Sequence, residues 1–189
     1  KSTNALEVIT QKAFSGLDVR TELETLREYH FEILNDLFSA DHPIFDLCSV
    51  YFEEIRVRCS SRSNTPYDPF YDEIVSQGEL ISSQILSAFL TEEGIPNKWQ
   101  DARKLLRCSP PFRDACVDWE SSRAKIQEHL GGSENVLHVS QGFIAGTEEG
   151  DTITLGREGS DYSAAIFASC LDAKEVLVWK DVPGLMNAD

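Results

Sequence analysis

Apolar residues recur at helical spacing through much of the first half of the chain. This pattern predicts a helix that starts near Thr3, after a run of capping residues, and further helices over residues 21–38 and 42–58. The second and third helices keep one polar face, which is typical of helices that cover another layer. We therefore expect these two helices to form an antiparallel cover or lid without chemistry of its own.

Residues 71–90 carry two helical patterns that are separated by Gly78. A glycine at this place predicts that one helix ends there and that Glu79 begins the next one. A carboxylate in the first turn of a helix usually does no more than complement the helix dipole. The pattern by itself therefore favours a structural role for Glu79.

Strands and helices alternate along the rest of the chain. The expected elements are a short strand within 99–107, a helix over 117–130 ended by Gly131 and Gly132, a buried strand over 136–144, a helix over 164–171 and a final strand over 175–179. Alternation of this kind predicts a mainly parallel sheet that is covered by helices on both faces.

A glycine-containing segment, residues 154–165, leads into the last of these helices. Gly156 and Gly159 permit a tight turn and a close approach of the backbone to a ligand. Ser160 is a suitable N-cap, and Asp161 suits the first turn of the helix. The N–H groups at such a helix start favour a phosphate, although a glycine turn before a capped helix also occurs in many folds that bind nothing there.

Composition narrows the classes of function. The chain has 189 residues, enough for one domain, and a net charge of −15 with no basic cluster. Such acidity disfavours binding to nucleic acid or to an anionic membrane surface, and no apolar run approaches the roughly 20 residues of a membrane span. The five cysteines contain no C-x-x-C pair and the four histidines are scattered. We therefore expect no metal site on the protein, and reduced thiols in the cytoplasm.

Several segments resemble aspartate kinase, a member of the amino acid kinase family. They are Lys1-Ser-Thr-Asn4, Gly78-Glu-Leu-Ile-Ser82, Gln141-Gly-Phe-Ile144, Thr154-Leu-Gly-Arg-Glu-Gly-Ser-Asp-Tyr-Ser-Ala-Ala165 and Val178-Trp-Lys-Asp-Val-Pro-Gly-Leu-Met-Asn-Ala-Asp189. The resemblance implies a three-layer α/β/α sandwich with a mainly parallel central sheet, incomplete at both ends. Residues 1–189 would belong to one catalytic domain, with a helical substrate side at about 1–130 and a nucleotide side at about 131–189.

The resemblance implies that the γ-phosphoryl group of ATP, which would bring Mg²⁺ with it, is transferred to the side-chain carboxylate of L-aspartate. The product, 4-phospho-L-aspartate, would begin the pathway to lysine, threonine and methionine. Arg157 would grip a substrate carboxylate and Glu79 the ammonium group. In the family the counterpart of Asp161 holds an essential lysine whose segment this sequence does not contain. The catalytic candidates are Arg157 and Asp161, and the further substrate-binding candidates are Thr3, Val75 and Phe143.

On the nucleotide side, backbone groups of Gly159 and Ser160 would face the phosphate. The remaining nucleotide candidates are Lys180, Asp181 and Met186, and the family often has Thr in place of Lys180 and Tyr in place of Met186. The family also usually has glycine where this chain has Glu158. That substitution adds a negative charge and removes a backbone conformation that is open mainly to glycine, so we expect Glu158 to point outward.

Two other functions stay open at this point. One is another kinase of the same fold with glutamate or N-acetylglutamate as acceptor, although Glu79 together with Arg157 favours a free α-amino acid. The other is a non-catalytic ligand-binding module of that fold. The chain begins at Lys1 and ends at Asp189, and we expect both ends to be cuts in a longer protein. The resemblance implies that the parent is a homo-oligomer and allows fusion to regulatory domains or to homoserine dehydrogenase, and the piece alone would be inactive.

Overall fold

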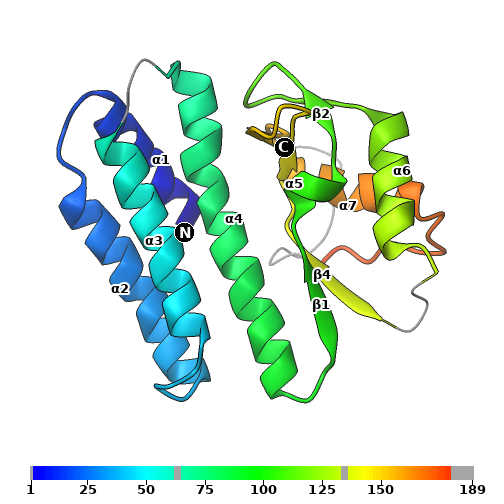
Figure 1. Cartoon of the computed structure of the whole chain (residues 1–189), viewed down its shortest axis with the longest axis horizontal. Helices are drawn as coiled ribbons and strands as arrows, with labels where there is room; N and C mark the ends of the chain where they lie inside the picture. The colour runs from blue at the N-terminus through cyan, green and yellow to red at the C-terminus, as the bar shows by residue number, and fades with distance from the viewer. Residues whose placement is uncertain (1, 62–64, 133–135, 180–189) are drawn as a thin grey trace, which may run out of the picture.

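The computed structural model describes residues 2–61, 65–132 and 136–179. Four helices form the first half of the chain. They are α1 (Ser2–Phe14), α2 (Arg20–Leu37), α3 (Ile44–Ser60) and α4 (Tyr67–Glu92). The predicted helices near Thr3, over 21–38 and over 42–58 are confirmed. α1, α2 and α3 pack on one side of α4, and strands lie along its other side (Figure 1).

Helix α4 runs through Gly78 without a break, so the expected interruption is wrong. Gly78 instead faces α1, where an added Cβ atom would lie 3.0 Å from Leu6 Cδ1. The glycine therefore permits close contact between two helices. Glu79 lies about three turns inside α4, so the dipole of a helix start does not explain a carboxylate at this position.

Short strands and helices form the second half of the chain. They are β1 (Asn97–Gln100), α5 (Ala102–Leu105), β2 (Cys108–Ser109), β3 (Cys116–Val117), α6 (Trp119–Leu130), β4 (Leu137–Ser140), β5 (Ile144–Gly146), β6 (Thr152–Thr154) and α7 (Gly159–Cys170). β1 and β4 pair in parallel, whereas β2 pairs with β3 and β5 with β6 in antiparallel fashion. α6 and α7 lie on the side of the strands opposite α4 (Figure 1). In the described residues, the expected parallel sheet is thus represented by one parallel pair.

Two strands expected in this half differ from the structure. The strand expected over 136–144 is split, because the chain turns at Gly142, where an added Cβ would lie 2.9 Å from Ser160 Cα. Its first part is only partly buried, since Leu137 is 45% exposed whereas Val139 is 7% exposed. The strand expected within 99–107 ends at Gln100, after which Asp101 accepts a hydrogen bond from Arg103 N and starts α5.

The last part of the described chain differs most from expectation. Residues 175–179 form no strand, because they pair with no described strand, and Trp179 is 89% exposed. The last helix, expected to follow Ser160 as N-cap and to begin at Asp161, begins two residues earlier, at Gly159. The helix expected over 117–130 is confirmed as α6, which starts after Asp118 accepts a hydrogen bond from Ser121 N.

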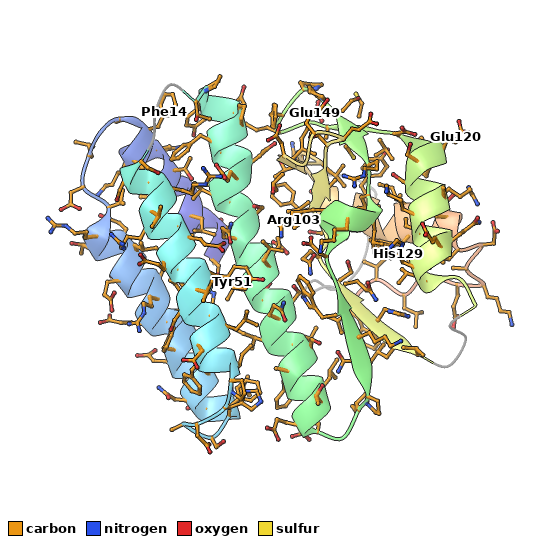
Figure 2. The ribbon with its side chains drawn as sticks, viewed as in Figure 1. Phe14, Tyr51, Arg103, Glu120, His129 and Glu149 are labelled. Carbon is orange, nitrogen blue, oxygen red and sulfur yellow. The ribbon has the colours of Figure 1, made fainter. Side chains whose placement is uncertain are left out.

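Two buried apolar clusters stabilise the fold. The helical cluster, which includes Leu6, Leu34, Ile55 and Ile74, lies within α1–α4. The strand-side cluster includes Leu105, Leu106, Ile126, Ile153 and Ile166. Figure 2 shows Tyr51 on the helical side and Arg103 on the strand side, with α6 residues Glu120 and His129 at the far edge.

A small third cluster joins the two layers. Leu80 of α4 packs with Ala102 and Ile144, and Trp99 and Phe143 lie against them. This contact brings α4 beside the turn that precedes β5. Within the described part of the chain, no helix is both long enough and apolar enough to cross a membrane.

Candidate active site

A cavity of about 260 Å³ lies where α1, α4, the turn before β5 and the start of α7 meet. Its walls are formed by Thr3, Glu79, Phe143, Gly156, Glu158, Gly159, Ser160 and Asp161. Six residues that were predicted for the site therefore lie together: Thr3, Glu79, Phe143, Gly159, Ser160 and Asp161. Separate segments of the chain supply them, and folding alone brings them to one place.

Glu79 contributes a carboxylate from the middle of α4. Its side chain forms no ion pair or hydrogen bond with the residues that the structure describes, and burial raises its pKa above the usual range. A carboxylate that has lost water without gaining a partner is unfavourable in the empty protein. A cationic group in the cavity, such as a ligand ammonium, would compensate this cost.

Phe143 and Gly159 lie against each other in the cavity wall, and they fit only because residue 159 is glycine. An added Cβ at Gly159 would lie 2.8 Å from Phe143 Cδ2. The Phe143 N–H donates to Ser163 Oγ at 2.9 Å, and this hydroxyl donates to the Gly159 carbonyl at 2.8 Å. These bonds hold Phe143 at φ 70°, a conformation that non-glycine residues rarely adopt. The aromatic wall and the start of α7 are thus set at a fixed spacing.

The glycine loop, residues 155–158, leads into α7. Glu158 occupies the N-cap position with φ 58° and ψ 20° and makes no side-chain cap hydrogen bond. The prediction of Ser160 as N-cap is therefore wrong, since Ser160 lies within the first turn. The backbone conformation of Glu158 is left-handed and is open mainly to glycine. We expected that Glu158, which stands where the family usually has glycine, would not adopt it, and this expectation is wrong. The Gly159 N–H already donates to the Gly156 carbonyl oxygen at 3.1 Å, so the next N–H group, that of Ser160, is the one that the helix start offers to an anion in the cavity.

Other residues from the sequence prediction lie at the edge of the cavity, behind its wall or outside the described part of the chain. Arg157 is exposed beside the cavity and forms no ion pair with the described residues. Val75 is 1% exposed and packs in the helical cluster, one turn before Glu79, without lining the cavity. Glu158, which we expected to point outward, is exposed but also lines the cavity. The nucleotide candidates Lys180, Asp181 and Met186 lie outside the described residues.

Asp72 is a functional candidate that the sequence analysis missed. It is 0% exposed, and its two oxygens accept hydrogen bonds from the N–H of Arg113 and from the N–H and hydroxyl of Thr154. Burial raises its pKa, and these hydrogen bonds oppose the shift. A signal was present in the sequence, because Asp72 lies on the apolar face of a helix beside Tyr71 and before Ile74 and Val75. Carboxylates are rarely fully buried without a specific partner.

Similarity to known proteins decides the family. A model of the amino acid kinase family matches residues 4–189. The chain belongs to the amino acid kinase family. It is 33% identical over 169 residues to lysine-sensitive aspartokinase 3 of Escherichia coli, covering 89% of this chain and 37% of that protein. It is 32% identical over 166 residues to the bifunctional aspartokinase/homoserine dehydrogenase 2 of the same organism, covering 88% of this chain and 20% of that one. The chain thus spans well under half the length of these relatives.

Solved structures agree with this assignment. The crystal structure of E. coli aspartokinase III with aspartate and ADP matches with a TM-score of 0.88 at 32% identity, over 97% of this chain and 41% of that one. Clostridium acetobutylicum aspartate kinase matches with a TM-score of 0.76 at 22% identity, which shows the fold alone; the match covers 100% of this chain and 39% of that one. The predicted amino acid kinase fold, incomplete in this chain, is confirmed.

Proposed function

We propose that the full-length protein is an aspartate kinase that phosphorylates the side-chain carboxylate of L-aspartate with ATP. The observation that carries this proposal is the cavity that is lined both by the unpaired Glu79 carboxylate and by the start of α7. A free α-amino acid supplies the cation that Glu79 lacks, and a phosphoryl group suits the helix start. Relatives that are named aspartokinases, one of them solved with aspartate and ADP, share the sequence and fold.

The residues of the cavity suit phosphoryl transfer, which depends on positioning and charge more than on covalent catalysis. The substrate carboxylate is already a nucleophile, so no general base is needed. One of its oxygens bonds to the γ-phosphorus while the bond from that phosphorus to ADP breaks. Glu79 would hold the substrate ammonium and the exposed Arg157 would close on a substrate carboxylate. The Ser160 N–H would stabilise the charge on the transferred group. Gly159, whose own N–H donates to the Gly156 carbonyl, would let that group approach the backbone closely.

Thr3 and Phe143 would complete the substrate pocket, with Val75 supporting the wall from the helical cluster behind it. Asp161 lines the cavity beside the glycine loop and would position the cationic groups that neutralise the phosphates. Among the described residues, no group of three His, Cys, Asp or Glu is arranged to hold a metal ion. Glu158 and Asp161 could still hold a Mg²⁺ ion that arrives with the nucleotide, through water. The ion would supply charge neutralisation at the phosphates.

We further propose that Lys180, Asp181 and Met186 contact the nucleotide, and that residues 1–189 form part of one catalytic domain. Residues 1–130 would supply its substrate side and 131–189 its nucleotide side. The parent protein would act as a cytoplasmic homo-oligomer in the synthesis of lysine and threonine. Fusion to homoserine dehydrogenase is proposed because bifunctional relatives carry that name.

A hydroxylamine trap on the full-length protein tests the activity. An acyl phosphate made from Mg-ATP and L-aspartate gives a coloured hydroxamate, whereas simple ATP hydrolysis gives none. We expect colour with L-aspartate, and loss of colour in Glu79→Ala and Arg157→Ala. Glu93→Ala, at the exposed end of α4, should retain it. Colour only with L-glutamate or N-acetylglutamate would identify a different acceptor, and a folded protein that binds ATP without colour would be a non-catalytic module.

A further inference from the structure

The geometry points to Asp72 as a positioning residue that holds the glycine loop in register with Glu79 along α4. This inference rests on the proposed function, because it explains how the ammonium site at Glu79 and the phosphate site at the start of α7 are held at a fixed distance. Asp72 does not line the cavity and would not touch substrate. It would act through the segments that it binds.

Asp72 attaches the start of the glycine loop to α4. Its Oδ2 accepts the Thr154 N–H at 3.0 Å and its Oδ1 accepts the Thr154 hydroxyl at 2.7 Å. Thr154 is the last residue of β6, directly before the loop, and is 0% exposed. A buried carboxylate that receives two hydrogen bonds from one residue defines the position and the orientation of that residue.

The same carboxylate holds a second segment against the loop. Oδ2 also accepts the Arg113 N–H at 2.9 Å. The Arg113 guanidinium lies 4.3 Å from the centroid of the Tyr71 ring and pairs with Asp68, one turn earlier on α4. An added Cβ at Gly156 would lie 2.9 Å from the Arg113 carbonyl oxygen. The middle of the glycine loop is thus packed against a segment that is itself bound to Asp72.

Asp72 and Glu79 lie on the same face of α4. Seven residues are close to two helical turns, so the two carboxylates project in similar directions about 10 Å apart along the axis. The glycine loop runs from Thr154, bound to Asp72, to the start of α7, which lines the same cavity as Glu79. One rigid helix therefore sets the distance between the ammonium site and the phosphate site.

This arrangement predicts a specific kinetic effect. Without the Asp72 hydrogen bonds each half of the site keeps its own groups, so binding of aspartate and of ATP should change little. Their relative placement loosens, and misplacement of about 1 Å can cost on the order of 100-fold in rate. The loss should therefore appear in kcat while both KM values stay within about threefold of wild type.

The test uses the full-length protein with Asp72→Asn, which keeps the side-chain shape but turns one acceptor oxygen into a donor. We expect kcat for aspartyl phosphate formation to fall about 10- to 100-fold, with a circular dichroism spectrum like that of wild type. Asp68→Asn is the matched control, since it lies on the same helix, contacts the same Arg113 and makes only an exposed ion pair. It should keep kcat within about twofold of wild type.

A second pair of variants decides the matter if Asp72→Asn does not fold. Thr154→Val removes only the hydroxyl donor and should lower kcat with little change in KM, whereas Thr154→Ser retains the hydroxyl and should restore kcat. The positioning role is overturned if Thr154→Val and any folded Asp72→Asn keep wild-type kcat, or if kcat falls only in proportion to the folded fraction. Inactivity of the wild-type protein with aspartate would instead overturn the proposed function.

Discussion

Asp72 and Glu79 are two buried or half-buried carboxylates on one face of the same helix, yet their surroundings are opposite. Asp72 accepts three hydrogen bonds from Arg113 and Thr154. Glu79 has no partner among the described residues and borders a cavity. Burial raises the pKa of both groups, but hydrogen bonds oppose the shift only at Asp72.

The contrast shows that burial of a carboxylate can have two different consequences for a protein. A carboxylate that accepts hydrogen bonds from the protein stabilises one arrangement of the chain. Removal of this carboxylate leaves several buried hydrogen-bond donors unsatisfied. A carboxylate left without donors destabilises the empty protein and stabilises a complex with a cation. Removing Asp72 should therefore damage the fold, and removing Glu79 should damage binding while helping the fold.

The largest effect is expected for Asp72→Ala. This change leaves two N–H groups and a hydroxyl without their buried acceptor, and should lower the free energy of unfolding by about 2–4 kcal/mol. Urea denaturation followed by circular dichroism measures it. Asp68→Ala, which loses only an exposed ion pair with Arg113, should cost less than about 1 kcal/mol. Equal losses in the two variants would show that the buried hydrogen bonds do not carry the difference.

The next largest effect is expected for substrate binding by Glu79→Gln. Loss of a charged hydrogen-bond partner for the substrate ammonium should raise the KM for aspartate by about 10- to 100-fold. The KM for ATP should change little, because Glu79 faces the amino acid. Glu73→Gln provides the control, since Glu73 lies on α4 but pairs with Arg58. An unchanged KM for aspartate in Glu79→Gln would place the ammonium site elsewhere.

A smaller effect of opposite sign is expected for the stability of the same variant. The folded-state pKa of Glu79 is raised. Between the unfolded-state and the folded-state pKa, Glu79 is therefore protonated in the folded chain and ionised in the unfolded chain. The stability of the wild-type protein falls as the pH rises through this range. Glu79→Gln should therefore match wild type below about pH 4, near the unfolded pKa. It should be more stable by about 1 kcal/mol at neutral pH. Thermal denaturation at both pH values measures this, and a gain that is equal at both would exclude ionisation as its cause.

The smallest effect is expected for Glu158→Gly. Glu158 has a left-handed backbone conformation that costs a residue with a Cβ about 1 kcal/mol more than glycine, so the variant should gain about 0.5–1 kcal/mol in the free energy of unfolding. Glu158→Ala removes the charge but keeps the Cβ, and should not gain. A gain of equal size in both variants would assign the effect to charge and not to the backbone.

Periodicity identified most helices correctly because an amphipathic helix repeats its apolar positions within a few residues of sequence. The segments over 21–38 and 42–58 form α2 and α3 with boundaries shifted by one or two residues. Gly78 misled the prediction, because a glycine that ends a helix and one that admits a neighbouring helix look alike in sequence. Only Leu6, 72 positions earlier in the chain, distinguishes the two cases.

The residues of the candidate site also fall into two groups, those that short sequence segments predicted and those that only the fold reveals. Glu79, Phe143, Gly159 and Asp161 were predicted from the resemblance of short segments, and all four line one cavity. Asp72 was not found, because its partners Arg113 and Thr154 are 41 and 82 residues away. The strand expected over 175–179 failed for a related reason, since strand structure needs a neighbouring strand for its backbone hydrogen bonds.

The sequence by itself determined which segments are helical, the family to which the chain belongs and the residue types available for the chemistry. These properties depend on neighbours within a few positions or on short motifs. The tertiary structure alone decided which carboxylate accepts hydrogen bonds from the protein and which has no partner among the described residues. Burial and hydrogen bonding depend on segments that meet only after folding. Asp72 and Glu79 are alike in the sequence, and the chain packed around them makes one an anchor and leaves the other open to a ligand.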